Sequence, residues 1–260
     1  LDIVLCLLYF LLVKDKISSL EINSVLTLDN VYIEGIVFEL CKYYKLKMYT
    51  GFDINLLTFH MYVSENDYNQ HCRTPDIDYA LRIFETNVFK NKRDEFLQKR
   101  FSGNQNQHDA KRAFSPNNIK LTRQELVNKY DLNDNKIVLV LPHIFCDAPH
   151  GYPSVFYQDY KYWLTDTLKV LSKNKNITII IKEHPSTELF SETGQLEELV
   201  IKLNLPNLKL ISNNINARSL MNIVDTIVTC GGTSGMEYAY HGVPVIIASS
   251  PPYGNYNFVN

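Results

Sequence analysis

Several features that would place this chain in a familiar class are missing from its 260 residues. The formal net charge is only -2 at pH 7, so the chain has no basic surplus, and no nucleic-acid partner is predicted. The five cysteines are odd in number and lack the spacing of a disulfide framework, which favours a reducing, cytoplasmic location. The chain also lacks the G-x-x-x-x-G-K-[ST] loop of P-loop NTPases and the G-x-G-x-x-G fingerprint of dinucleotide-binding enzymes.

Long apolar runs are missing too. The most apolar stretch, residues 4–13, is too short to span a membrane. Asp2 stands where a signal peptide would carry positive charge. We therefore expect a buried strand or helix here, with a truncated membrane anchor as the alternative. The chain begins at Leu1 without a Met and ends without a clear terminal element, which suggests a piece of a longer protein.

The first part of the chain has the pattern of a partial α/β domain, which we place at residues 1–110. Apolar runs at residues 25–28 and 46–49 predict strands, and apolar residues at helical spacing predict a helix over residues 31–44. Glu34 lies early on this helix, near the carboxyl end of a predicted strand, where open α/β sheets place their sites. The helix dipole alone also explains an acid at that position.

A polar segment separates this part from the rest. Residues 63–98 are charged and predicted to be helical, and they contain no recognisable site. Residues 102–120 are rich in Asn, Gln and Ser without periodicity, which predicts a linker. We assign the second domain to residues 111–260. Thr122, with Glu125 three residues later, predicts a capping box at the start of a helix.

The second domain alternates strand and helix patterns. The strand runs are continuously apolar, as expected for parallel strands that are covered on both faces. This pattern predicts a doubly wound, Rossmann-like α/β domain. Strands are predicted at residues 136–141, 177–182, 208–211, 226–230 and 245–247, and helices at residues 155–171, 195–203 and 219–223.

Three polar loops follow predicted strands of this domain, and their sequences are P-H-I-F-C-D-A-P-H-G-Y, K-E-H-P-S and G-G-T-S-G. Carboxyl ends of parallel strands meet at one edge of an open sheet, where ligands bind, so we expect the loops to lie close together. The side chains of His143, Cys146, Asp147 and His150 in the first loop could suggest a metal centre. The proline and aromatic content favours an irregular loop instead, and no metal site is predicted.

The third loop, G-G-T-S-G, joins a buried strand to a helix. Such a glycine turn lets backbone N–H groups converge at the positive end of a helix dipole, which favours a bound anion, usually a phosphate. Gly232, Thr233 and Ser234 are the residues that would contact it. Glu237, one turn into the helix, could accept hydrogen bonds from ribose hydroxyls. A turn needed only for packing and a solvent-facing acid are the alternatives.

The second loop offers two donors at the end of a buried strand. Lys182 and His184 can both donate hydrogen bonds to a phosphate. Pro185 restricts His184 to an extended conformation. The alternative is that His184 only caps the following turn. Because the second and third loops belong to one sheet edge, they support the same anion.

Two runs together carry a resemblance: I-I-I-K-E-H-P-S, and D-T-I-V-T-C-G-G-T-S-G-M-E-Y-A-Y-H-G-V-P-V-I-I. They resemble the C-terminal half of GT-B glycosyltransferases. The resemblance covers roughly residues 137–247 and is greatest to the capsule polysaccharide biosynthesis group. That group includes transferases that use CMP-linked Kdo, and it is related to bacterial sialyltransferases. The fold implied is GT-B-like, with a Rossmann-like C-terminal domain and a partial N-terminal α/β domain.

The resemblance implies a glycosyltransferase of capsule or lipopolysaccharide synthesis. Its substrates would be a nucleotide-sugar donor and a glycan or glycolipid acceptor. No further cofactor and no metal are expected. The location implied is cytoplasmic, with peripheral association at the inner face of the membrane as an option.

Roles for individual residues follow from the same resemblance. His184 and Lys182 match the nucleotide-contacting His-Pro region, while Thr233 and Ser234 match the phosphate-contacting motif. Glu237 matches the acid that holds ribose. The family's catalytic base usually lies in the N-terminal domain, which is too short here to be complete. Among the residues present, Asp147 is the first candidate base and Glu34 the second.

Three other functions stay open at this point. A sugar-nucleotide epimerase uses the same nucleotide grip. A polyol-phosphate transferase also has a His-Pro loop, but its usual D-Y-S-S turn is C-G-G-T-S-G here. A non-catalytic nucleotide-binding subunit of a surface-polymer complex is the third.

Overall fold

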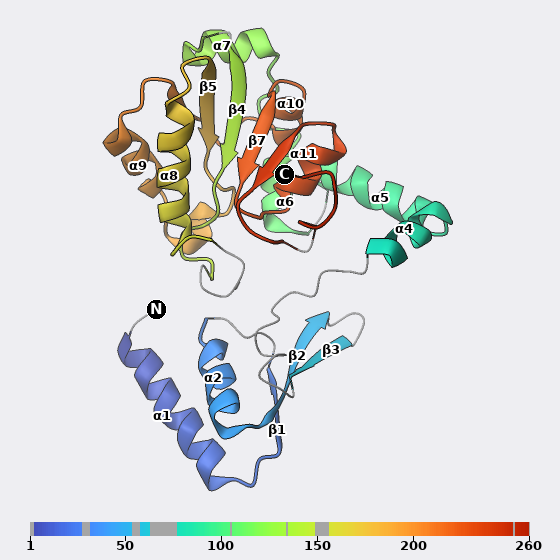
Figure 1. Ribbon diagram of the computed structural model, residues 1–260, viewed down its shortest axis with the longest axis vertical. Helices are drawn as coiled ribbons and strands as arrows, with labels where there is room; N and C mark the ends of the chain where they lie inside the picture. The colour runs from blue at the N-terminus through green and yellow to red at the C-terminus, as the bar shows by residue number, and fades with distance from the viewer. Residues whose placement is uncertain are drawn as a thin grey trace. The chain divides into compact units, whose positions relative to one another are not determined.

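The chain forms two compact units, which are described separately (Figure 1). Unit 1 comprises Leu1–Arg73 and His150–Pro153, and unit 2 comprises Thr74–Pro149 and Ser154–Asn260. The computed structural model describes residues 3–27, 32–53, 58–62, 77–104, 106–133, 135–148, 156–251 and 253–259. His150, one of the first-loop residues, lies outside these ranges.

Unit 1 contains a small mixed sheet and two helices. Strand β1 (Ser24–Thr27) pairs in parallel with β2 (Lys47–Asp53), which pairs antiparallel with β3 (Thr58–Tyr62). Helix α2 (Glu34–Tyr44) joins β1 to β2. Its buried side chains, with that of Met48, form a small core of Phe38, Cys41 and Met48. The strand–helix–strand order predicted for this part is confirmed.

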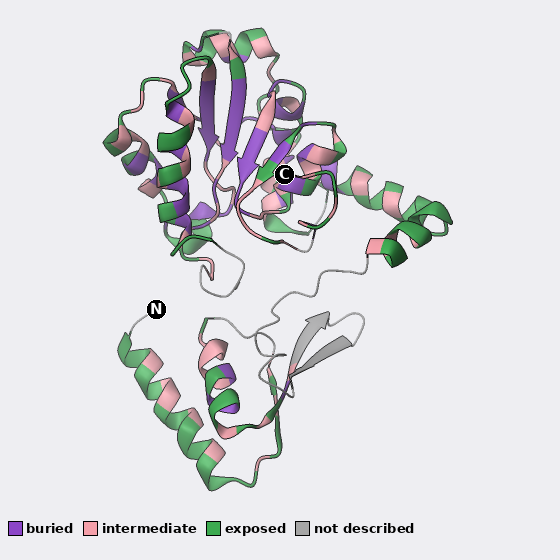
Figure 2. Cartoon of the chain, in the orientation of Figure 1, coloured by how far each residue is buried: buried purple, intermediate pink, exposed green. Residues whose placement is uncertain are grey.

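The apolar N-terminal run is a helix, α1 (Ile3–Ser19), but it is not buried. The expected burial is wrong, because none of the α1 side chains is buried (Figure 2). The run is apolar on all sides, and the neighbouring helix α2 can cover only one of them. None of the described helices combines the length and the apolar character that a membrane crossing requires.

Unit 2 is built on a parallel sheet with the order β6-β5-β4-β7-β8. Counted along the chain, this order is 3-2-1-4-5, the order of Rossmann-type sheets. The predicted doubly wound α/β domain is therefore confirmed. The strands are β4 (Lys136–Leu141), β5 (Ile177–Lys182), β6 (Leu208–Ile211), β7 (Thr226–Thr229) and β8 (Val245–Ile247).

Helices cover both faces of this sheet. Successive side chains of a strand point to opposite faces, and β4 shows the consequence. Ile137 and Leu139 belong to one buried cluster, with residues of α7, α10 and α11, whereas Val138 and Val140 belong to another, with residues of α8 and α9. Figure 2 shows the sheet as the most buried part of unit 2. The helices, including the 3₁₀ helix η1, are α4 (Ile77–Glu85), α5 (Lys90–Phe101), α6 (His108–Ala113), α7 (Arg123–Tyr130), α8 (Tyr160–Ser172), η1 (Thr187–Phe190), α9 (Gln195–Leu203), α10 (Ala217–Met221) and α11 (Ser234–Tyr240).

Local signals set some of these boundaries. The predicted capping box is present at the start of α7, where the Thr122 hydroxyl accepts from the Glu125 amide and the Glu125 carboxylate accepts from the Thr122 amide. Helix α8 begins at Asp159, whose carboxylate accepts from the amide of Tyr162. Both contacts satisfy amides that have no partner within the helix.

The boundary between units differs from the domain division predicted at residue 110. Helices α5 and α6 belong to unit 2. The Phe101 ring lies edge-on to Phe114 at a centroid distance of 5.3 Å and stacks on Tyr240 of α11. Ala110 is buried in the same cluster. These apolar residues are too sparse to give a periodic pattern, so the segment resembled a linker.

This packing leads to a truncation test. A chain that begins at residue 77 should keep cooperative unfolding of unit 2. A chain that begins at residue 111 loses Phe101 and Ala110 from the core, and it also loses Arg100, which forms an ion pair with Glu237 of α11. We expect it to lose at least about 4 kcal/mol, since deleting a buried Phe side chain alone costs about 3–5 kcal/mol. Urea unfolding followed by tryptophan fluorescence measures both. Equal stability of the two fragments would support the domain boundary at residue 110 that the sequence predicted.

Candidate functional site

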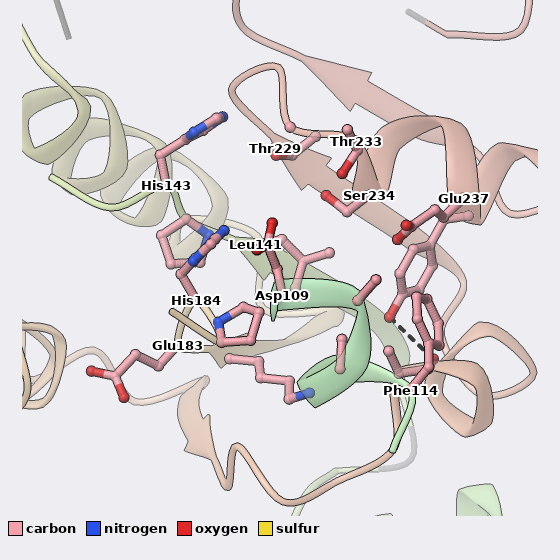
Figure 3. Close-up of a pocket in the computed structure, with 18 of the residues that line it drawn as sticks. Asp109, Phe114, Leu141, His143, Glu183, His184, Thr229, Thr233, Ser234 and Glu237 are labelled. Carbon is pink, nitrogen blue, oxygen red and sulfur yellow. Dashed lines mark hydrogen bonds between the residues drawn. The ribbon is translucent and has the colours of Figure 1, made fainter. Parts of the chain in front are cut away.

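A cavity opens at the carboxyl edge of the unit 2 sheet, beside the ends of β4, β5 and β7 (Figure 3). The winding of the sheet reverses between β4 and β7, so the crossover helices diverge there and leave a crevice. All three polar loops contribute to its lining, as expected from the sequence. Helix α6 closes another side with Asp109, Ala110 and Ala113.

Lys182 is one of the buried cations that line this cavity. It is the last residue of β5, is 6% exposed, and donates from Nζ to the Ile215 carbonyl at 2.8 Å. Within the described part of the chain, Lys182 forms no ion pair. Burial lowers the pKa of Lys182 to about 8. A buried ammonium group without an anion is costly, so this position suits a ligand that brings negative charge.

His184 follows on the same loop. Its Nδ1 accepts from the Ser186 amide at 3.2 Å, so the proton of the neutral ring lies on Nε2. Burial lowers the pKa of His184, and the charge of Asp109 opposes that shift. Figure 3 shows His184 and His143 on one side of the cavity, with Thr233, Ser234 and Glu237 on the other. A neutral His184 can therefore offer one N–H donor to a ligand.

The loop around His184 is fixed by helix α6. The Ser186 hydroxyl donates to Asp109 at 3.3 Å and lies 3.1 Å from Nδ1 of His108. Asp109 also lines the cavity, and Figure 3 shows it between the two sides. Sequence analysis missed Asp109, because it lies in the segment that resembled a linker.

The glycine turn forms the opposite wall. Gly232, Thr233 and Ser234 line the cavity at the start of α11, where amides have no intrahelical partner. A Cβ built on Gly232 would lie 3.5 Å from Nε2 of His143, which is an ordinary van der Waals contact. The Gly232 carbonyl accepts from the Tyr253 hydroxyl at 2.5 Å. This hydrogen bond fixes the backbone of the turn.

Glu237 lines the same wall, but it is not a free acid. Its carboxylate accepts from Nε of Arg100, on helix α5. Burial raises the pKa of Glu237, and Arg100 opposes that shift. Arg100 was missed by sequence analysis, because nothing in the charged pattern of α5 distinguishes one arginine from its neighbours.

The loop after β4 has its own anchor. The Glu192 carboxylate is buried and accepts from the amides of Phe145 at 2.8 Å and Cys146 at 2.7 Å. His143 stacks on Tyr160 at a centroid distance of 4.6 Å, and burial lowers the pKa of His143 to about 4. The ring is therefore neutral at pH 7. Glu192 carries no sequence signal that would have identified it.

The two predicted base candidates are placed differently. Asp147 lies in the loop after β4, but it does not line the cavity. Burial lowers the pKa values of His143 and His184, and the charge of Asp147 opposes both shifts. Glu34 is the first residue of α2 in unit 1. Their catalytic roles stay predictions. The described residues contain no cluster of three or more His, Cys, Asp or Glu side chains arranged to hold a metal ion.

Residues 96–255 match the sequence profile of the family described as capsule polysaccharide biosynthesis protein. The chain belongs to this family. The resemblance predicted from its two motif-bearing runs is therefore confirmed. No curated protein sequence matches the chain.

Solved structures match the chain at low identity and low TM-score. The KpsC β-Kdo 2,7-transferase of Thermosulfurimonas dismutans is 19% identical over 53% of this chain and 43% of its own, with a TM-score of 0.39. Anabaena HepE in complex with UDP-glucose is 17% identical over 48% and 33%, with a TM-score of 0.32. A Rickettsia africae glycosyltransferase is 13% identical over 96% and 64%, with a TM-score of 0.38. The chain thus spans less than half the length of the first two.

The burial of Lys182 should lower the free energy of unfolding by a measurable amount. Its pKa falls from the usual 10.5 to about 8 on folding, so below pH 8 the folded state is penalised by about 3 kcal/mol. We predict that Lys182→Met raises the free energy of unfolding at pH 7 by about 1–2 kcal/mol, after loss of the Ile215 hydrogen bond. The gain should shrink as the pH rises from 8 towards 10.5, because the cost of removing the proton of Lys182 on folding falls to zero as the pH approaches the unfolded-state pKa.

Urea unfolding at pH 7 and pH 10 measures this effect. Lys136→Met is the matched control, because Lys136 lies at the other end of the sheet with a side chain that is 75% exposed and paired with Asp225. It should give no gain. Destabilisation by Lys182→Met at both pH values would show that the ammonium group is satisfied within the fold.

Proposed function

We propose that unit 2 binds the nucleotide of a nucleotide-sugar donor, as part of a glycosyltransferase that assembles a capsule or lipopolysaccharide. One observation carries this proposal. A buried lysine, which has no counter-ion among the residues that the structure describes, lines the cavity at the switch point of a sheet with Rossmann order. Ligands of open α/β sheets bind at this point, and a phosphate would supply the missing negative charge. Membership of the capsule polysaccharide family supports the same substrate class.

The lining offers a donor set that suits a phosphate. Lys182 would contribute a charge, and His184 a neutral N–H. The opposite wall would add backbone amides of the glycine turn and the hydroxyls of Thr233 and Ser234. In sugar transfer these groups would stabilise the charge that develops on the leaving nucleotide phosphate. We propose that they do so without a metal ion.

The acceptor side needs a base to take the proton of the attacking hydroxyl. Asp147 and Glu34 remain the candidates proposed from the sequence. Asp109 joins them, because its carboxylate lines the cavity and contacts Ser186 of the His-Pro loop. We place the reaction in the cytoplasm, where nucleotide sugars are made.

The proposal is tested first by calorimetric titration with UDP, CMP and CDP-glycerol. Binding of UDP or CMP is expected, and tighter binding of CDP-glycerol would favour a polyol-phosphate transferase. Product analysis with the labelled nucleotide sugar then separates transfer from epimerisation. Absence of binding by all three nucleotides would overturn the proposed function.

His184→Ala should weaken nucleotide binding at least about tenfold, since a hydrogen bond to a charged group contributes about 1.5–3 kcal/mol. His108→Ala is the matched control, because His108 contacts the same loop through Ser186 but does not line the cavity. It should leave the affinity within about twofold. If both variants weaken binding equally, His184 acts only through the loop's shape.

Binding should also draw a proton onto Lys182. Its pKa of about 8 leaves it mostly neutral at pH 8.5, and a bound phosphate favours the charged form. We therefore predict proton uptake on binding at pH 8.5, and an affinity that falls as the pH rises above 8. Titration in two buffers of different ionisation enthalpy measures the uptake. Lys182→Met should abolish it, and uptake that survives in this variant would assign the proton elsewhere.

A further inference from the structure

Helix α5 is highly charged and largely exposed, but its carboxyl end is buried in the core of unit 2. Arg100 and Phe101 are the buried residues of this helix, and Arg100 is 7% exposed. A buried guanidinium group is costly unless it is paired, so the burial of Arg100 requires a specific partner. Phe101 supplies the packing of the helix end, so the position of Arg100 has a separate reason.

The guanidinium of Arg100 contacts three acceptors. Its Nε donates to Glu237, its Nη2 donates to the Thr233 hydroxyl at 3.3 Å, and its Nη1 donates to the Gln107 amide oxygen at 2.7 Å. Arg100, Thr233 and Glu237 all line the cavity. One side chain from outside the Rossmann sheet therefore holds two residues of the proposed nucleotide site.

The charge of Arg100 matters as much as its shape. The Glu237 side chain is 12% exposed, and an ionised carboxylate so buried needs a cation nearby. Burial raises the pKa of Glu237, the charge of Arg100 opposes this shift, and the charge of Asp109, across the cavity, adds to it. Without Arg100, the carboxylate would lose its counter-ion beside a site that is proposed to receive phosphate. A lysine could supply the charge but not the planar fork that reaches several acceptors.

We propose that Arg100 is a positioning residue that orients Glu237 and Thr233 towards the ligand, and so sets a preference for ribonucleotides over deoxyribonucleotides. This inference rests on the proposed function. Oε1 of Glu237 is held by Arg100, and its other oxygen has no hydrogen-bond partner among the described residues, so that second oxygen would accept from a ribose hydroxyl. Thr233 is held in the same way at the phosphate end. Arg100 itself stays engaged with these protein groups and does not contact the ligand.

The experiment compares each nucleotide that the wild-type chain binds with its 2′-deoxy and 3′-deoxy forms, by calorimetry. The wild-type chain should prefer the ribonucleotide over one of these deoxy forms by roughly tenfold, as expected for a hydrogen bond to a charged group. Arg100→Met and Glu237→Gln should each reduce that preference to about twofold or less. The double variant should reduce it no further, because both changes remove the same contact.

Two further variants show whether an effect of Arg100→Met on binding comes from misfolding. Arg100→Lys keeps the charge, so it should fold and keep the affinity for the deoxy form while losing most of the preference. Arg112→Met is the matched control, because Arg112, on the neighbouring helix α6, forms a more exposed ion pair with Glu188 of η1. It should keep the full preference.

The outcomes separate the two proposals. If Arg100→Met and Arg100→Lys weaken ribo- and deoxyribonucleotides equally, Arg100 has only a structural role and the inference is wrong. If the preference persists in Glu237→Gln, ribose does not reach Glu237 and the inference also fails, while nucleotide binding still stands. A wild-type chain that binds no nucleotide overturns the proposed function itself.

Discussion

The sheet of unit 2 winds in one direction from β4 to β6 and in the other from β4 to β8. This reversal leaves a crevice beside the ends of β4 and β7 that the crossover helices do not cover. The cavity is located there, and the residues that line it come from loops far apart in the sequence. Any group that belongs to the site must therefore reach this one point, whichever strand carries it.

The site contains two buried cations that are held in different ways. Arg100 is paired with Glu237 and is satisfied within the protein. Lys182 has one carbonyl partner and a lowered pKa, so its charge is only partly compensated. A fold selected for stability alone would favour an apolar residue at the end of β5, like the three buried isoleucines that precede it at 179–181. This contrast is the reason for our proposal that Lys182 serves a ligand, whereas Arg100 serves the protein.

Much of this arrangement could be predicted from the sequence. The continuous apolar runs predicted the parallel strands, and the three polar loops after them predicted where side chains would gather. Arg100, Asp109 and Glu192 could not be predicted, because each is a single polar residue whose role depends on a distant partner. The prediction of a linker at residues 102–120 was wrong for a related reason. Two of its apolar residues, Ala110 and Phe114, are buried in a core that the local pattern does not reveal.

The family match begins at residue 96, close to the point where α5 enters the core of unit 2. The family's sequence unit therefore includes the end of α5 and all of α6, and not only the Rossmann sheet that begins with β4. Helix α6 supplies Asp109 to the cavity and holds the His-Pro loop through Ser186. Helix α5 supplies Arg100 to the opposite wall. A Rossmann sheet positions loops at one edge, and these two helices fix the loops on both sides of that edge, so they belong to the proposed binding site as much as the strands do.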